Sequence, residues 1–257
     1  MKNKLSRLYL YTIFAFLYAP IIVLIIYSFN ESKYRVWTGF SFKWYIELFS
    51  DSKIMEALSN TLIVAVVAAV LSTIIGTIAA IGIENLKKWK KTVVMNITML
   101  PVLNPDIVTG ISLMLLFYIA KLPTGRFTLI LAHMAFCIPY VILSVMPKLK
   151  QVNNTTFEAA LDLGATPAYA TWKITIPEIM PGVINGLLMA FTLSIDDFIV
   201  SYFTTGPGVE NLSILIYNAA RKGVSPSINA LSALMFSVIL ILLVIINVRT
   251  SKTAEKA

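Results

Sequence analysis

The chain has 257 residues, of which 58% are hydrophobic and only 13% are charged. This composition excludes an ordinary soluble domain and indicates a membrane protein. The formal net charge of +8 requires no nucleic-acid partner, because basic residues collect in the loops on one side of a membrane. The single cysteine, Cys137, lies inside an apolar run, so an internal disulfide is excluded.

Apolar runs long enough to cross a membrane predict an all-α polytopic protein with six transmembrane helices. They lie at about residues 8–29, 57–83, 92–120, 127–147, 181–205 and 226–248. The first run lacks a small-residue cleavage site, so we expect a retained helix and not a signal peptide. Most lysines and arginines then fall on the side of both termini, which predicts that the N- and C-termini are cytoplasmic.

The segment at residues 30–56 is expected outside the membrane and is rich in aromatic residues, among them Trp37, Trp44 and Tyr45. One interpretation is an aromatic belt at the membrane interface. The other is a surface at the mouth of a transport pathway that attracts a cation by cation–π contact, with Trp44 as the candidate substrate contact. Both interpretations stay open at this point.

Small residues recur at intervals of four in the second and fifth runs, which predicts close helix packing on those faces. They are Ala68, Ser72, Gly76 and Ala80, and then Gly182, Gly186, Ala190 and Ser194. A loop of four lysines around Trp89 explains the orientation of the second and third runs, and contact with membrane lipid is a further reading of it.

The third run contains Pro101 and then Asn104-Pro105-Asp106. Two prolines four residues apart break or kink a helix, and transporters build binding sites at broken helices near the middle of the membrane. An acid at this depth is costly and must face water or the protein interior. Asp106 is therefore a candidate substrate contact, and the alternative is that it caps the second half of the helix.

The fifth run ends in Ser194-Ile195-Asp196-Asp197-Phe198. Two adjacent acids in a membrane span indicate function. They diverge by about 100° on a helix, so we expect one to line a pathway and the other to be protonated or hydrogen-bonded. His133, the only histidine, is interpreted as a hydrogen-bonded packing residue, since nothing near it in the sequence completes a metal site.

Residues 155–181, between the fourth and fifth runs, are neither apolar nor a short turn, and we call them the EAA segment. Thr155 and Glu158 have capping-box spacing, which predicts a helix from Thr155, and Gly164 suits the left-handed residue that ends it. Thr166 before a proline predicts the start of a second helix, and Pro177 is expected to stop that helix. The first helix has an acidic edge that suits a partner with basic residues, and the alternative is a solvated loop helix.

The EAA segment resembles the EAA motif of ABC-importer permeases. That motif is Glu-Ala-Ala, three residues, Gly, nine residues and then Ile-x-Leu-Pro. Here it reads Glu158-Ala159-Ala160, Gly164 and Ile174-Thr175-Ile176-Pro177, with one departure at Ile176. Nearly the whole chain is similar to the branch of this family that transports spermidine and putrescine, through the six runs and the short motifs around Asp106 and Asp197.

The resemblance implies that residues 1–257 form a single permease domain in a bacterial inner membrane. It also implies that residues 148–180 form a cytoplasmic coupling loop that docks on an ATPase. The residues carried over to coupling are Glu158, Ala159, Ala160, Asp162, Gly164, Ile174 and Pro177. The implied partners are a sister permease subunit, a pair of cytoplasmic ATPases and an extracytoplasmic polyamine-binding protein.

The chain has no phosphate-binding loop, no Ser/His/Asp or Cys/His arrangement and no metal cluster, so we expect a transport subunit and not an enzyme. No cofactor is expected in this chain, because ATP and magnesium would be bound by the partner ATPase. Three acids at membrane depth suit a polycation, which favours a polyamine held by Asp106, Asp196 and Asp197. The alternatives are an ABC permease for another substrate such as a ferric ion, thiamine or sulfate, a gradient-driven cation carrier, and a structural membrane subunit.

Overall fold

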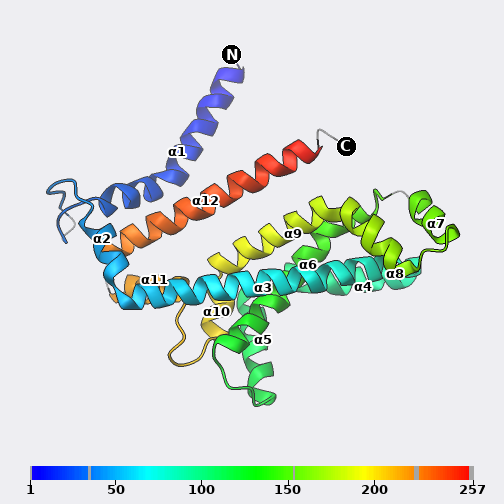
Figure 1. The fold of residues 1–257 in the computed structure, drawn as a ribbon. Helices are drawn as coiled ribbons and strands as arrows, with labels where there is room; N and C mark the ends of the chain where they lie inside the picture. The colour runs from blue at the N-terminus through cyan, green and yellow to red at the C-terminus, as the bar shows by residue number, and fades with distance from the viewer. Residues whose placement is uncertain (1, 34–35, 153, 223–225, 255–257) are drawn as a thin grey trace. The chain divides into compact units, whose positions relative to one another are not determined.

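The computed structural model describes residues 2–33, 36–152, 154–222 and 226–254. Every regular element in these ranges is helical, which confirms the predicted all-α class (Figure 1). The expected single domain divides into two compact units. Unit 1 comprises Met1–Leu58 and Leu212–Ile241, and unit 2 comprises Ser59–Asn211 and Leu242–Ala257.

Unit 1 contains the long first helix and a small helical core. Its elements are α1 (Lys2–Ser28), α2 (Lys43–Ser50), the start of α3 (Ser52–Glu84), α11 (Leu212–Lys222) and the first part of α12 (Pro226–Ala254). The core is made by Trp44, Leu48, Ile54, Ala57, Leu212, Ala230 and Leu231. Most side chains in the most apolar part of α1, Tyr9–Ser28, are exposed, although Ser28 at its end is buried. This part of α1 therefore presents its apolar side chains to surroundings other than this chain.

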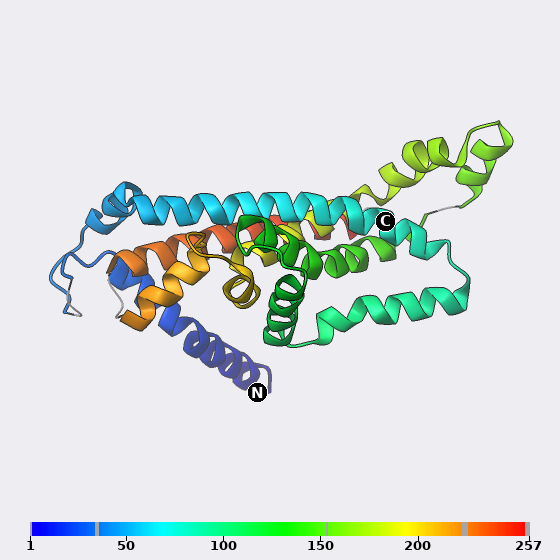
Figure 2. The same cartoon turned by 90° about the horizontal axis from the view of Figure 1, so that it is seen from below.

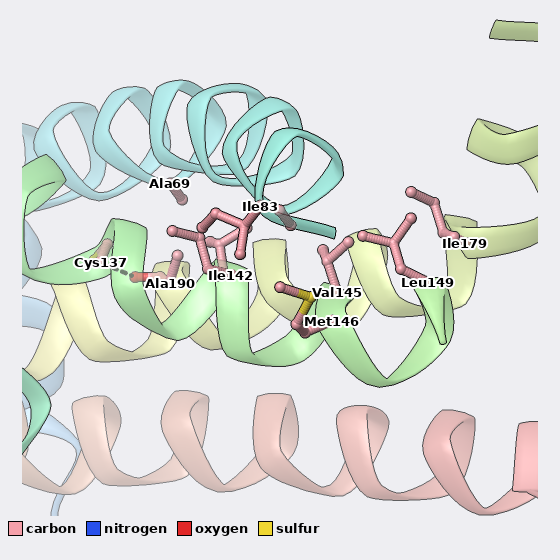
Figure 3. Packing of buried hydrophobic residues seen from close by; sticks show 11 residues of the cluster. Ala69, Ile83, Cys137, Ile142, Val145, Met146, Leu149, Ile179 and Ala190 are labelled. Atoms are coloured by element: carbon pink, nitrogen blue, oxygen red, sulfur yellow. Dashed lines mark hydrogen bonds between the residues drawn. The ribbon is translucent and has the colours of Figure 1, made fainter. Parts of the chain in front are cut away.

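Unit 2 is a bundle that carries every candidate site residue except Trp44. It contains most of α3, then α4 (Lys88–Leu103), α5 (Asp106–Ile119), α6 (Arg126–Leu149), α7 (Asn154–Asp162), α8 (Pro167–Ala170), a π-helix at Thr171–Thr175, α9 (Ile176–Asp196) and α10 (Ile199–Thr204). Helix α6 is central, and Figure 3 shows its buried side chains between α3 and α9. Cys137 lies in this core, where its thiol donates to the Ala190 carbonyl.

Both predicted small-residue faces are buried, which confirms that they serve helix packing. They meet the same residue of α6. A Cβ added to Gly76 would lie 2.7 Å from Val141 Cγ1, and one added to Gly186 would lie 3.2 Å from the same atom. Helices α3 and α9 therefore both approach α6 at Val141, and a larger side chain on either helix would separate them.

The number of membrane-crossing helices differs from the prediction. Among the described residues, four helices are long and apolar enough to cross a membrane, and a fifth span results if α4 and α5 are counted together. The predicted third span is not one straight helix, because α4 and α5 are bent by 103° at Asn104 and Pro105 (Figure 2). Proline donates no backbone hydrogen bond and disfavours a helical conformation in the residue before it.

The predicted fifth span also breaks. Helix α9 ends at Asp196, Asp197 has an extended backbone, and α10 follows after Phe198. The last predicted span begins at Pro226 as expected, and its described apolar part, Pro226–Ile241, is shorter than the four long candidates. The predicted count of six is therefore not confirmed.

Candidate functional site

The two broken helices of unit 2 meet at their breaks. Helix α5 starts at Asp106, directly after the first break, and α10 starts directly after the second. Gly110 allows the two short helices to touch, since a Cβ there would lie 3.0 Å from Phe203 Cδ2 and 3.4 Å from Val200 Cα. Broken helices of this kind place backbone ends and acidic side chains around a common space inside a membrane protein.

A cavity of about 440 Å³ lies at this junction and brings together all three predicted acids. It is lined by Asp106, Phe136, Tyr140, Thr192, Leu193, Asp196, Asp197, Phe198, Ile199 and Val200. The acids come from two parts of the chain that are some 90 residues apart. Asp106 and Asp196 are exposed, whereas the side chain of Asp197 is 10% exposed.

The two adjacent acids have different surroundings. Asp197 accepts hydrogen bonds from the backbone N–H groups of Val200 (3.2 Å) and Ser201 (2.7 Å), and so caps the first turn of α10. Asp196 is the last residue of α9 and stays exposed. The prediction that one acid is hydrogen-bonded agrees with this geometry, although both line the same cavity.

His133 on α6 sits directly behind the second break and is 1% exposed. Its Nδ1 lies 2.6 Å from Ser194 Oγ, and its Nε2 lies 2.9 Å from Ser201 Oγ. The same Nε2 is 3.6 Å from Asp197 Oδ2. The interpretation of His133 as a hydrogen-bonded residue is confirmed. In the described ranges, no group of three or more histidine, cysteine, aspartate or glutamate side chains is arranged to hold a metal.

Aromatic side chains that were not predicted as substrate contacts form part of the cavity wall. Phe136 and Tyr140 lie one turn apart on α6, and Phe198 lies at the break after α9. Their i and i+4 spacing was a visible signal, but one span alone does not show which face meets the acids. Carboxylates beside aromatic rings form a surface complementary to a cation with an apolar chain.

The surroundings of Trp44 differ from those expected for a substrate contact. It is 6% exposed, and its indole N–H donates to the Asn30 carbonyl at 2.6 Å. The Lys43 ammonium lies 5.2 Å from the centre of its ring, so a cation of the chain itself already occupies the cation–π position. Trp44 is therefore a core residue of unit 1.

The end of the first helix of the EAA segment has the predicted geometry. Helix α7 begins at Asn154, one residue before the predicted start, and Gly164 has a φ of +90°, in the left-handed region. The N–H of Gly164 bonds the Leu161 carbonyl, and the N–H of Ala165 bonds the Ala160 carbonyl. These two bonds are the Schellman pattern, which satisfies the last carbonyls of a helix and reverses the chain direction.

The second part of the segment differs from the prediction at Pro177. Thr166 caps α8 as expected, by accepting the N–H of Tyr169. Pro177, however, does not stop the helix. It is the second residue of α9, and the π-helix directly before α9 lets the helical chain continue past it. In that wider turn the Ile176 N–H bonds the Thr171 carbonyl, and a proline in the first turn of α9 leaves no required bond unmade.

The EAA segment exposes both charge and apolar surface. Glu158, Ala159 and Asp162 are exposed, while Ala160 and Ile174 are half-buried. Three large apolar side chains stand out beside them: Leu163 is 89% exposed, Trp172 69% and Tyr169 58%. Such a set on a polar loop marks a surface that contacts another molecule.

Comparisons with known proteins agree with these features. Residues 72–250 match the family described as binding-protein-dependent transport system inner membrane component. The putrescine transport system permease protein PotI of Escherichia coli (strain K12) is 41% identical over 235 residues, which cover 88% of this chain and 83% of the relative. The spermidine/putrescine transport system permease protein PotC of Haemophilus influenzae is 36% identical over 249 residues, with 96% and 97% covered.

Solved structures show the same fold at low sequence identity. A bacterial ABC transporter that imports alginate has a chain with a TM-score of 0.70 and 19% identity, covering 98% of this chain and 95% of its own. The MetNI methionine ABC transporter has a chain with a TM-score of 0.55 and 15% identity, covering 80% of this chain and 96% of its own. The chain therefore belongs to the inner membrane component family of binding-protein-dependent transport systems, and it is a transport permease subunit and not an enzyme.

Proposed function

We propose that this chain is the permease subunit of an ATP-driven importer of polyamines such as spermidine and putrescine. The observation that carries the proposal is the cavity in which Asp106, Asp196 and Asp197 lie together beside aromatic side chains. The curated relatives that transport putrescine and spermidine support the same cargo.

The chemistry of the cavity matches a polyamine better than the alternatives. A polyamine carries ammonium groups separated by methylenes, so it needs carboxylates at separate points and apolar or aromatic walls between them. Asp106 and the Asp196–Asp197 pair supply the carboxylates, and Phe136 and Tyr140 supply the walls. Three acids disfavour an anion such as sulfate. A compact metal ion would leave the aromatic walls without a role.

The EAA segment is the proposed contact with the ATPase partner. Glu158 and Asp162 offer charge to basic residues of that partner, and Leu163, Tyr169 and Trp172 offer apolar area. The Schellman turn at Gly164 holds α7 against the start of α8. A displacement of α7 by the ATPase is therefore transmitted to α9 through the π-helix. Ala159 and Ala160 keep α7 narrow, and Ile174 and Pro177 anchor its connection to α9.

The proposed assembly contains a sister permease subunit, two cytoplasmic ATPases that bind ATP and magnesium, and an extracytoplasmic polyamine-binding protein. Both termini and the EAA segment face the cytoplasm in this arrangement, as the distribution of lysine and arginine predicts. The exposed apolar surface of α1 then contacts lipid or the sister subunit. A carrier driven by an ion gradient would explain the acids but would give the EAA segment no role.

The test is radiolabelled spermidine uptake into vesicles that hold the chain with its partners, with ATP inside and the binding protein outside. Glu158→Lys reverses the charge on α7, and Glu56→Lys, at an exposed position of α3 outside the EAA segment, is the matched control. We expect ATP-dependent uptake that Glu158→Lys abolishes and Glu56→Lys preserves. Uptake that continues without ATP but stops with an uncoupler would replace the importer by a carrier. ATP-dependent transport of other solutes only would discard the polyamine.

A further inference from the structure

A single buried side chain joins the two helices on either side of the second break. His133 of α6 contacts Ser194, three residues before Asp197 in α9, and Ser201, four residues after it in α10. All three residues are at most 2% exposed. Each ring nitrogen has a partner whichever of the two carries the proton, so the ring is held at both ends.

The Asp197 carboxylate depends on the position of α10. Its two oxygens accept N–H groups from the first turn of that helix, so a rotation of α10 would carry the carboxylate with it. Helix α10 has only six residues. A helix this short is not stable by itself and takes its position from contacts with its neighbours.

Ser201 is where those contacts converge. It is fully buried, and its hydroxyl is bonded by His133 on one side and by the Asn211 side-chain amide, at 2.8 Å, on the other. A second contact between α6 and α10 lies at the opposite end, where Thr128 donates to the Thr204 carbonyl at 3.1 Å. Only the His133 contact adjoins Asp197, because His133 Nε2 lies 3.6 Å from Asp197 Oδ2.

We propose that His133 is the positioning residue of the cavity: it fixes the break between α9 and α10 and thereby keeps the Asp197 carboxylate at the cavity wall. This inference rests on the proposed function, since it assigns His133 a role in binding the cation. His133 itself does not line the cavity. Its effect on transport therefore passes through Asp197.

A double-mutant cycle in the complete importer tests this dependence. The variants are His133→Ala, Asp197→Asn and the two combined, compared by initial rates of spermidine uptake per assembled complex. We expect His133→Ala to slow uptake at least about tenfold, because it removes both buried contacts that fix the break between α9 and α10. We expect the double variant to be within about twofold of Asp197→Asn alone, because His133 has nothing left to position.

Two further variants separate positioning from general stability. Thr128→Val removes the contact of Thr128 with Thr204 of α10, together with its bonds to Gly125. Its effect on uptake should be about twofold or less, alone or with Asp197→Asn. His133→Gln places an amide near the position of Nε2 and should restore part of the uptake that His133→Ala loses. The amount of complex that is purified, with its ATPase activity, reports folding without reference to cargo.

The outcomes distinguish this inference from the proposed function. Normal spermidine uptake by Asp197→Asn would overturn the cavity as the substrate site. If Asp197→Asn slows uptake and the losses of the two single variants multiply in the double variant, the cavity remains the substrate site. The proposed role of His133 would then be wrong. Failure of both the His133→Ala and His133→Gln complexes to assemble would also overturn it, since His133 would then serve folding alone.

Discussion

Replacing Asp197 by asparagine removes one negative charge from the cavity and keeps a side chain of the same shape. The N–H groups of Val200 and Ser201 bond separate oxygens of Asp197, and asparagine keeps one of these two acceptors. The substitution therefore removes the carboxylate charge from the cavity wall together with one hydrogen bond to the first turn of α10. Asp106→Asn and Asp196→Asn make the same change at exposed positions.

The burial of each acid sets the expected size of its effect. The Asp197 side chain is only 10% exposed, and a hydrogen bond to a charged partner in such surroundings contributes about 1.5–3 kcal/mol. Its loss should slow spermidine uptake by about 10- to 150-fold. Ion pairs at exposed positions contribute about 0.2–1 kcal/mol, so Asp106→Asn and Asp196→Asn should each slow uptake by about fivefold or less.

The assay is the initial rate of radiolabelled spermidine uptake into vesicles that hold the complete importer, measured at two salt concentrations. The effects of Asp106→Asn and Asp196→Asn should shrink at high salt, whereas that of Asp197→Asn should persist, because ions screen exposed charges more than buried ones. Assembly and ATPase activity should be unchanged in all three variants. If all three import spermidine at the wild-type rate, the assignment of the cavity as the binding site is wrong.

Two predictions concern packing. Gly76→Val should lower the free energy of unfolding by about 1–3 kcal/mol, because the new Cβ would lie 2.7 Å from Val141 Cγ1; thermal unfolding of the purified complex measures this, and Gly82→Val, where a Cβ meets no atom within 4 Å, is the control. Trp44→Phe should cost about 0.5–1.5 kcal/mol by removing the hydrogen bond to the Asn30 carbonyl, with normal spermidine uptake per assembled complex. If a stable Trp44→Phe complex loses uptake, Trp44 contacts the substrate after all and its assignment to the core alone is wrong.

Local features of the chain were predictable because they depend on residues close together in sequence. Gly164 ends α7 because glycine adopts the left-handed conformation without a steric penalty. The third run bends at Asn104 and Pro105, because Pro105 donates no backbone hydrogen bond and disfavours a helical conformation at Asn104. The small residues of the second and fifth runs predicted close packing, since only small side chains let helix backbones approach. Pro177 was mispredicted, because a π-helix before it satisfies the backbone in another way.

The assembly of the cavity depends on contacts between distant residues, and only the tertiary structure decides those. The sequence marked Asp106 and Asp197 as costly acids without showing that they share a cavity. It did not show that His133 spans the break behind them, because its partners Ser194 and Ser201 are more than 60 residues away in the chain. Hydropathy and spacing report one helix at a time. Which faces meet is determined by how the helices pack, and that packing buried Trp44 and brought the acids together.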